Sequence, residues 1–410
     1  MFSIYEALGL IFVIFSPIIF LIRIIMGKEN PKRFLEKFCI YSKKKIYEKT
    51  IWFHGSSVGE ILSVIPLIYE LEKNKKIKKI LLSSSTTSSA LIFSKYKFKK
   101  TTHIYFPIDT NYFTNKFINY WKPKMAIFID SEIWPNMFNN LEKIKIPIIL
   151  INGRITKKSF ERWTRFPSFA VKIFSKISLA LPQNTETFKY LKTLGVRKIK
   201  IAGNLKYFGQ SKNILDKNTK QKFKNRLIFC AASTHYNEEL FIGKLHKELK
   251  SKYKNLLTIL IPRHINRSSS IINELEGINL NIVTRSSQQK VSKSTDIYIA
   301  DSYGEASKFY KLSKITFLGG SLIKHGGQNP LEPARLGNHI MHGPNIQNFK
   351  EVYKMLSELK ISTKVNNINN MKKIIDRKIE YKQPKKIIKK LNLKGIHILK
   401  KNLIEINKFL

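Results

Sequence analysis

The chain has 410 residues, and its 74 Lys and Arg against 28 Asp and Glu give a formal charge of +46. That length exceeds what one hydrophobic core usually holds, so we expect two domains. A hydrophobic content of 43% excludes a disordered chain, and two cysteines, Cys39 and Cys230, exclude a disulfide framework or a cysteine metal cluster. The charge favours a polyanionic partner such as nucleic acid, although abundant Lys, Ile and Asn also fit a coding bias spread over the surface.

The amino terminus carries an apolar run at residues 7–22, which residues 24–26 extend past Arg23. About 20 residues at roughly 1.5 Å each give about 30 Å, the thickness of one bilayer core. Residues 1–6 hold no Lys or Arg and no small-residue cleavage site follows, which disfavours a cleaved signal peptide. We therefore expect residues 1–27 to form a membrane anchor helix; a buried or interfacial helix of the first domain is the alternative.

Basic residues follow the apolar run, and by the positive-inside rule they place the rest of the chain in the cytoplasm. They are Lys28, Lys32, Arg33, Lys37 and Lys43-Lys44-Lys45.

From residue 50 onward, short β-rich runs alternate with longer segments of helical period, which predicts βα units and parallel sheets. The candidate strands of the first half are 51–53, 80–82, 104–106, 125–129, 148–151 and 199–201, with helices such as 61–71, 113–120 and 186–194 between them. A polar, Lys-rich stretch at 208–225 interrupts the pattern. Strands then resume at 227–229, 257–261, 297–299 and 315–318.

Two doubly wound α/β halves joined near residue 210 are the simplest architecture for this pattern. Ligands of such sheets bind at the carboxyl ends of the strands, so we expect the active site in a cleft between the halves. The tail from Lys372 is basic, and we expect its last helix to dock on a domain through one apolar face. That face holds Leu399, Leu403, Ile406 and Leu410.

The sequence HGSSVGE at 54–60 joins a predicted strand to a predicted helix. Its small residues allow a ligand close to the backbone, and the free amides of a helix start favour anions. Glu60 stands where the helix begins, so the helix dipole would keep its carboxylate ionised, as a general base requires. The alternative is a Glu that only caps the helix.

The sequence DSEIWPN at 130–136 ends an apolar strand with two acids one residue apart. Asp130 and Glu132 could hold a divalent metal, or place one carboxylate in the cleft and the other in a supporting role. They share a strand face if the strand persists, so their spacing does not establish a metal site. Farther along, GNLK at 203–206 brings Lys206 to the hinge, where a cation could stabilise developing negative charge.

The second half carries polar residues after two of its predicted strands. Pro262-Arg263-His264 ends the strand 257–261, and the planar guanidinium of Arg263 suits a phosphate. The sequence GGS at 319–321 ends the strand 315–318, so its backbone amides could cradle phosphate.

A glycine-rich segment, GGQNPLEP at 326–333, follows that loop. We predict Asn329 as a helix N-cap, Pro330 as the first helical residue and Glu332 as the third. A helix start aimed at the cleft would hold phosphate, and Glu332 could accept ribose hydroxyl protons. The strand, the Gly-Gly loop, the capped helix and the acid together predict a nucleotide site.

These segments together resemble the bacterial 3-deoxy-D-manno-oct-2-ulosonic acid (Kdo) transferases, glycosyltransferase family thirty, which build the inner core of lipopolysaccharide. The resemblance runs in order from the apolar run to about residue 352. The matching blocks are 54–60, 130–136, 152–154, 203–206, 232–235, 262–264, 303–305 and 319–332, extended by 343–344 and 348–349.

The resemblance implies an α/β fold of GT-B type, with two Rossmann-like doubly wound domains facing a cleft after the anchor helix. It implies an acceptor-binding domain at 28–207, a CMP-sugar-binding domain at 208–370 and a basic helical tail at 371–410. The implied reaction transfers Kdo from CMP-Kdo to a lipid A precursor (lipid IVA) at the inner membrane and releases CMP. CMP carries one phosphate, so the resemblance implies no metal and no other cofactor.

Carried over by motif, Glu60 resembles the general base that takes a proton from the acceptor hydroxyl. Asp130 falls on the first acid of the family's ETELWPN block, a transition-state-stabilising carboxylate, but is one methylene shorter than that Glu. Lys206 falls on a second stabilising residue. The CMP-binding elements fall on Pro262, Arg263, Tyr303, Gly304, Glu305, Asn329, Pro330, Leu331 and Glu332.

Two departures from the family pattern fall in the nucleotide elements. Gln328 replaces the usual His of GGHN, and YGEA at 303–306 differs from MGEL. We expect both changes to tune the nucleotide pocket rather than abolish it.

Two other classes of function remain alternatives. One is a different GT-B glycosyltransferase, such as one that uses a UDP-sugar. The other is a basic nucleic-acid-binding protein, which the lack of a recognised motif or aromatic stacking platform disfavours. With an anchor and a sugar-nucleotide site, the charge of +46 fits an anionic inner leaflet and a bis-phosphorylated lipid acceptor better than nucleic acid.

Overall fold

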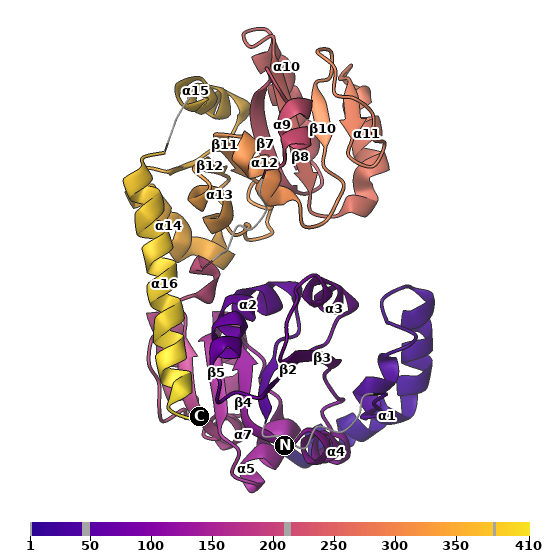
Figure 1. The fold of residues 1–410 in the computed structure, drawn as a ribbon, viewed down its shortest axis with the longest axis vertical. Helices are drawn as coiled ribbons and strands as arrows, with labels where there is room; N and C mark the ends of the chain where they lie inside the picture. The colour runs from indigo at the N-terminus through magenta and orange to yellow at the C-terminus, as the bar shows by residue number, and fades with distance from the viewer. Residues whose placement is uncertain (1, 43–49, 209–214, 380–382) are drawn as a thin grey trace. The chain divides into compact units, whose positions relative to one another are not determined.

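The computed structural model describes residues 2–42, 50–208, 215–379 and 383–410. The chain divides into two compact units: unit 1 is Met1–Phe208 with Lys394–Leu410, and unit 2 is Gly209–Leu393. Each unit contains one parallel sheet with helices packed around it (Figure 1). The two parallel-sheet α/β domains predicted from the alternation are confirmed. The predicted basic run Lys43-Lys44-Lys45 and residues 209–214 of the predicted connecting stretch lie outside the described residues.

Unit 1 has a six-stranded parallel sheet in the order β3-β2-β1-β4-β5-β6. The winding reverses between β1 and β4, which is where doubly wound sheets bind their ligands. The strands are β1 (Thr50–His54), β2 (Lys79–Ser84), β3 (Thr101–Tyr105), β4 (Pro123–Ile129), β5 (Ile148–Gly153) and β6 (Ile177–Pro182). The helices are α1 (Phe2–Ile25), η1 (Phe34–Phe38), α2 (Val58–Lys73), α3 (Thr87–Ser94), α4 (Asn111–Trp121), α5 (Pro135–Lys143), α6 (Lys157–Thr164), α7 (Pro167–Phe174), α8 (Thr185–Thr193) and η2 (Leu205–Tyr207).

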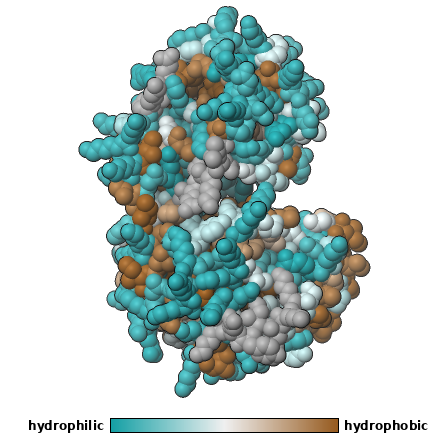
Figure 2. All heavy atoms as spheres, viewed as in Figure 1, coloured by the Kyte–Doolittle hydropathy of each residue, from teal (hydrophilic) through white to brown (hydrophobic). Residues whose placement is uncertain are grey.

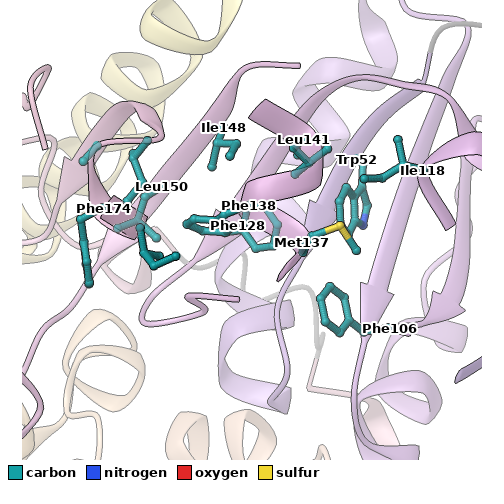
Figure 3. Close-up of a cluster of buried hydrophobic side chains, with 14 of the residues drawn as sticks. Trp52, Phe106, Ile118, Phe128, Met137, Phe138, Leu141, Ile148, Leu150 and Phe174 are labelled. Carbon is teal, nitrogen blue, oxygen red and sulfur yellow. The ribbon is translucent and has the colours of Figure 1, made fainter. Parts of the chain in front are cut away.

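The core of unit 1 holds β1 firmly in place. All five residues of this strand are buried, as expected for a central parallel strand covered on both faces. The Trp52 ring lies 4.6 Å from the Phe117 ring and 5.3 Å from the Phe128 ring, centroid to centroid, and Figure 3 shows Trp52 and Phe128 in this cluster. The indole Nε1 donates to Ser83 Oγ at 2.8 Å, so no polar atom of Trp52 is left unpaired. The strand that leads to the loop at 54–60 is therefore rigidly positioned.

Unit 2 has a seven-stranded parallel sheet in the order β13-β12-β11-β7-β8-β10-β9, with the winding reversal between β7 and β11. The strands are β7 (Leu227–Thr234), β8 (Leu256–Pro262), β9 (Ile282–Thr284), β10 (Ile297–Ile299), β11 (Ile315–Leu318), β12 (His339–His342) and β13 (Ser362–Lys364). The helices are α9 (Lys217–Lys222), α10 (Glu238–Lys250), η3 (Ile265–Arg267), α11 (Ser268–Glu276), α12 (Ala306–Leu312), α13 (Leu331–Arg335), η4 (Gln347–Phe349), α14 (Lys350–Glu358) and α15 (Ile368–Lys378).

The predicted strand at 199–201 is wrong. Only Ile199 pairs, through an isolated bridge to Ala180, and the sixth strand of unit 1 is β6 instead. The sequence of β6, ISLALP, contains Ser and Ala, so it is less β-rich than the runs that were recognised. The strands β9, β12 and β13 were also missed. The sequences of β12 and β13, HIMH and STK, hold few β-branched or aromatic residues, unlike the equally short β10, IYI, which was predicted.

The last helix, α16 (Lys385–Asn407), is continuous in chain, but its residues from Lys394 onward belong to unit 1. Leu399 and Ile406 are buried there, which confirms that the helix docks on a domain through its apolar face. The segment expected as a tail at 371–410 is thus shared: α15 belongs to unit 2 and residues 394–410 to unit 1.

Among the described residues, one helix is long and apolar enough to cross a membrane, and that helix is α1. The predicted helical segment at the amino terminus is therefore present. Most of its large apolar side chains are exposed, which is unusual for a helix that belongs to a globular core.

Candidate active site

The loop after β1 brings Glu60 back onto the carboxyl edge of the sheet. Ser57 is the N-cap of α2, and its hydroxyl and the Glu60 carboxylate form a capping box. Glu60 Oε2 accepts from the backbone N–H of Ser56 at 2.7 Å and of Ser57 at 3.3 Å. A Cβ at Gly55 would lie 2.9 Å from Ile129 Cδ1 and 3.1 Å from Glu60 Cβ, so glycine is needed for this close return. Glu60 therefore does cap the helix, as the alternative reading of the sequence held.

Capping does not keep the Glu60 carboxylate fully ionised at neutral pH. Burial, together with the negative charges of Glu132 and Asp130, raises the pKa of Glu60 to about 7. The expectation that the helix start would dominate is wrong, because desolvation and two like charges outweigh it. A carboxylate with a pKa near the operating pH is a stronger base than an ordinary Glu and is still available in its ionised form.

The pKa of Glu132, a second acid near Glu60, is shifted in the opposite direction. Its Oε2 accepts from Ser56 Oγ at 2.7 Å and from Trp134 Nε1 at 2.8 Å, and lies 3.1 Å from His54 Nε2. Burial would raise the pKa of Glu132, but the hydrogen bonds from His54, Ser56 and Trp134 and the His54 charge lower it below its usual value. Two neighbouring carboxylates whose environments separate their pKa values are typical of a site that handles protons.

Asp130 takes a left-handed backbone conformation, with φ 57°, directly after β4 ends at Ile129. The strand does not persist through Glu132, so the two acids do not share a strand face. Asp130 Oδ1 accepts from the side-chain amide of Asn152 and from Gln183 Nε2 at 3.3 Å. Asp130 thus belongs to a network separate from that of Glu132.

Lys206 completes this network, with Nζ 3.2 Å from Asp130 Oδ2. Asn152 Oδ1 accepts from the backbone N–H of Leu205 at 2.8 Å, so the same Asn positions both Asp130 and the turn that carries Lys206. The last helix supports this turn, because a Cβ at Gly203 would lie 2.9 Å from Ile398 Cγ1. The structure therefore brings Glu60, Asp130 and Lys206 to one edge of unit 1.

No group of three or more His, Cys, Asp or Glu residues in the described part of the chain is arranged to hold a metal ion. The interpretation of Asp130 and Glu132 as a pair without metal stays a prediction.

In unit 2, the predicted phosphate cradle at Gly319-Gly320-Ser321 is already occupied by a side chain. Glu238 Oε2 accepts from the N–H of Gly320 at 2.7 Å and of His235 at 3.0 Å. Its Oε1 accepts from Ser321 and Leu322 at 3.1 and 3.0 Å. The expectation that these amides hold phosphate is therefore wrong, because a buried carboxylate from the start of α10 takes them.

The predicted nucleotide residues lie in separate loops of unit 2. Pro262 is buried at the end of β8, and Arg263 follows it with an exposed side chain. Tyr303 is 64% exposed, and Gly304 has φ 84°. Glu305 Oε2 accepts from Ser302 Oγ at 2.5 Å and Oε1 from Lys308 Nζ at 2.8 Å; burial opposes ionisation, but these partners lower the pKa of Glu305.

The helix predicted at Asn329 begins one residue later than expected. Pro330 is the N-cap of α13, and Leu331 is its first residue. Asn329 Oδ1 accepts from the Leu331 N–H at 3.1 Å, as in an Asx turn. Pro330 and Leu331 are buried, whereas Glu332 is exposed.

His235 is a polar residue of this edge that the sequence analysis assigned no role. Its ring lies 4.3 Å from the His325 ring and 6.0 Å from the His264 ring, centroid to centroid. Burial, His325, His264 and Arg263 lower the pKa of His235 to about 4, against a backbone hydrogen bond to Ser233. His235 Nε2 is buried without a hydrogen-bond partner among the described residues. The only signal in the sequence was the block Ala232-Ser233-Thr234-His235.

Solved structures with this fold include a UDP-GlcNAc 2-epimerase and a MurG protein. UDP-GlcNAc 2-epimerase from Neisseria meningitidis, solved with UDP-GlcNAc, matches with a TM-score of 0.60 and 15% identity over 87% of this chain and 99% of that one. MurG from Acinetobacter baumannii matches with a TM-score of 0.51 and 7% identity over 88% and 100%. These likenesses concern the fold alone, which is the two-domain GT-B type.

Sequence comparison identifies the family to which this GT-B protein belongs. The family model described as 3-deoxy-D-manno-octulosonic-acid transferase (kdotransferase) matches residues 32–208. The 3-deoxy-D-manno-octulosonic acid transferase of Rickettsia bellii is 32% identical over 85% of this chain and 84% of its own. That of Haemophilus influenzae is 33% identical over 77% and 75%. The chain belongs to the 3-deoxy-D-manno-octulosonic acid (Kdo) transferase family and is a glycosyltransferase.

Proposed function

We propose that this chain transfers Kdo from CMP-Kdo to a hydroxyl group of a lipid A precursor (lipid IVA) during synthesis of the lipopolysaccharide inner core, with release of CMP. Family membership supports the transferred sugar. The observation that carries the chemistry is Glu60, a half-buried carboxylate at the winding reversal of unit 1 whose pKa is raised to about 7. Such a group can remove a proton from an acceptor hydroxyl at neutral pH.

The reaction is a direct displacement at the anomeric carbon of Kdo. Glu60 takes the hydroxyl proton, the acceptor oxygen forms the new bond, and the bond to the CMP phosphate breaks with its electron pair leaving on that phosphate. The Asp130 carboxylate stabilises positive charge that develops on the sugar, as carboxylates do in other glycosyl transfers. Lys206, 3.2 Å from Asp130, balances its charge and stabilises the negative charge of the departing phosphate.

The donor nucleotide is bound by the loops of unit 2 that end β8, precede α12 and begin α13. Arg263 supplies a planar cation to the phosphate, because the amides of Gly320, Ser321 and Leu322 are taken by Glu238. CMP-Kdo carries a single phosphate on its nucleotide, so the reaction requires no divalent metal to neutralise a diphosphate.

The enzyme works at the cytoplasmic face of the inner membrane, to which α1 attaches it. A lipid acceptor is confined to the bilayer, so membrane attachment brings the enzyme and acceptor to the same surface. The formal charge of +46 supports attraction to anionic lipids and to a phosphorylated acceptor.

Mass spectrometry of the products tests the proposal. Purified full-length protein with CMP-Kdo and a tetraacyl lipid A precursor in detergent should give products heavier by whole Kdo units, together with CMP. Glu60→Gln keeps a side chain that can cap α2, so the variant should fold but lose transfer by at least about 10³-fold. Glu70→Gln, at a partly exposed position of the same helix where the side chain pairs with Lys73, is the matched control and should keep full activity.

Three results would each refute a different part of the proposal. Transfer from a UDP-sugar with release of UMP or UDP in place of CMP would refute the donor. Near-normal turnover by Glu60→Gln would refute the base. Tight, salt-sensitive RNA binding without glycosyl transfer would refute the enzyme assignment altogether.

A further inference from the structure

Helix α1 packs against the rest of unit 1 from its first turn to its last. At its start, the Phe2 ring centroid lies 6.4 Å from that of Phe169 in α7. Near its end, the Phe20 ring centroid lies 5.4 Å from that of Phe38. Between these contacts, a Cβ at Gly9 would lie 3.3 Å from Thr110 Cγ2. The less exposed residues of the helix recur every three or four positions from Phe2 to Arg23, so one continuous face of the helix is packed on the domain.

A polar contact fixes the position of this face. Tyr5 OH donates to Asp109 Oδ2 at 2.7 Å, and the same carboxylate accepts from the N–H groups of Asn136 and Met137 at the start of α5. A helix that crossed the bilayer and left the membrane near Arg23 would hold Tyr5 about 27 Å away, at the far side. Asp109 belongs to the folded domain and cannot follow it there. The Tyr5–Asp109 hydrogen bond and a transmembrane orientation therefore exclude each other.

The opposite face of α1 is apolar and has no partner in the described part of the chain. Figure 2 shows brown, hydrophobic surface on the side of unit 1 where Figure 1 shows α1. Its exposed large side chains are Ile4, Leu8, Leu10, Ile11, Phe12, Ile14, Phe15, Ile18, Leu21, Ile22 and Ile25, and Met26 directly after the helix extends the strip. An exposed apolar strip of this length indicates contact with lipid or with another protein.

Basic residues at both ends of the strip favour lipid. At the Phe2 end, α6 and its C-cap residue form a patch with four cations and one acid: Lys157, Lys158, Glu161, Arg162 and Arg165. Nearby in α7, the Nζ atom of Lys172 lies 5.5 Å from the centroid of the Phe2 ring. At the other end, Lys28 and Lys32 are exposed just after the helix. Cations that border an apolar strip match anionic headgroups above the hydrocarbon of one leaflet.

We propose that α1 lies in the plane of the bilayer, with its exposed face in the cytoplasmic leaflet, and does not span the membrane. Because Asp109 also holds the start of α5, directly after Glu132 and Trp134, this attachment keeps the carboxyl edge of unit 1 close to the membrane surface. A lipid acceptor then presents its sugar to Glu60 without leaving the bilayer. That consequence rests on the proposed function; the orientation of α1 does not.

Disulfide cross-linking in isolated membranes tests the orientation without donor or acceptor. The native Cys39 and Cys230 are buried and free. Phe2→Cys with Phe169→Cys, and separately Gly9→Cys with Thr110→Cys, should cross-link within one chain when copper phenanthroline is added. Ile4→Cys with Phe169→Cys is the matched control, because Ile4 lies beside Phe2 along the helix but on its exposed face; this pair should not cross-link.

Cross-links in either packed pair, without one in the control pair, support the in-plane helix. Absence of cross-links in both packed pairs, in protein that still sediments with membranes, overturns it. Cross-linking of the control pair as readily as the packed pairs also overturns it, because the helix would then have no fixed face. Transfer of Kdo by protein that fails to cross-link would leave the proposed function intact while refuting this inference.

Vesicle flotation tests the lipid contact itself. Full-length protein should bind vesicles of phosphatidylethanolamine and phosphatidylglycerol more strongly than vesicles of phosphatidylcholine. Ile11→Glu with Ile18→Glu, at positions 51% and 61% exposed, should lower binding to the anionic vesicles at least about tenfold, because ionised carboxylates resist insertion into hydrocarbon. Leu91→Glu, at a position 65% exposed in α3, is the control and should bind normally. Equal binding by all three proteins would overturn the proposal, since the exposed face would not contact lipid.

Discussion

The two units place a glutamate at the same kind of position, beside the first strand of a doubly wound sheet, and use it in opposite ways. In unit 1, Glu60 shares its edge with Asp130 and Glu132, so its pKa rises to about 7. In unit 2, Glu238 is buried and accepts four backbone hydrogen bonds, one from His235 after β7 and three from Gly320, Ser321 and Leu322 in the loop after β11. The first arrangement leaves a group that can exchange a proton near neutral pH. The second fixes a loop and leaves donor binding to side chains.

The largest effect expected from this comparison is the loss of stability in Glu238→Gln. The substitution places an NH₂ group against two backbone N–H donors that now have an oxygen acceptor. Two buried amides without an acceptor cost roughly 2–6 kcal/mol, a large part of the stability of a single domain. We expect unit 2 to melt at a lower temperature and to be cleaved first in limited proteolysis.

The matched control for this substitution is Glu248→Gln on the same helix, where the side chain is partly exposed and pairs with Lys372. It should melt like the parent protein. If Glu238→Gln melts like the parent as well, the hydrogen bonds to Glu238 do not hold the loop, and Gly319-Gly320-Ser321 becomes available again as a phosphate site.

Loss of Lys206 should act on chemistry in unit 1. Lys206→Met removes the cation beside Asp130 and should lower kcat by about 10²–10³-fold, similar to the loss of one transition-state-stabilising group. Measured KM for CMP-Kdo should change much less. Lys200→Met, which removes a surface lysine paired with Glu405, is the control and should keep normal kcat. A normal kcat in Lys206→Met would restrict this lysine to a structural role.

Local patterns predicted the features that depend on neighbouring residues. The alternation of apolar runs predicted both sheets, and a strand followed by small residues and an acid predicted the place of Glu60. What the sequence could not show were contacts between distant segments. His54 meets Glu132 across 78 positions, and Glu238 meets Gly320 across 82. These pairs are set by which strands lie side by side, so no motif around Gly320 indicates that its amide is already bonded.

The raised pKa of Glu60 predicts a pH dependence of the rate. A base with a pKa of about 7 is mostly ionised at pH 8 and mostly protonated at pH 6, so kcat/KM should fall about tenfold between these values. Initial rates measured with detergent-dispersed acceptor across this range would show it. A flat profile from pH 6 to pH 8 would mean that Glu60 is not the titrating base.

The same shift predicts how stability changes with pH. The pKa of Glu60 is higher in the folded state than its ordinary value of 4.5, so the folded state holds the proton more tightly. This contribution to stability is present below about pH 4.5 and is lost as the pH rises through about 7, by roughly 3 kcal/mol at most. Glu60→Gln cannot ionise, so its melting temperature relative to the parent should be higher at pH 8 than at pH 5. An equal difference at both pH values would contradict the raised pKa.

The smallest effect that we expect is on donor binding by unit 2, after substitution of Asn329. Asn329→Ala removes the acceptor of the Leu331 N–H and should loosen the turn before α13, raising KM for CMP-Kdo about fivefold, or ~1 kcal/mol, with kcat little changed. Asn329→Asp retains the acceptor oxygen but adds a negative charge. If Asn329 acts only through the turn, the Asp variant should bind the donor nearly as well as the parent. If the side chain lies against the donor phosphate, the Asp variant should raise KM more than the Ala variant does, because repulsion adds to the loss of a contact. A fall in kcat without a change in KM would instead mean that Asn329 acts on the chemical step. Unit 2 would then contribute to catalysis at this position as well as to donor binding.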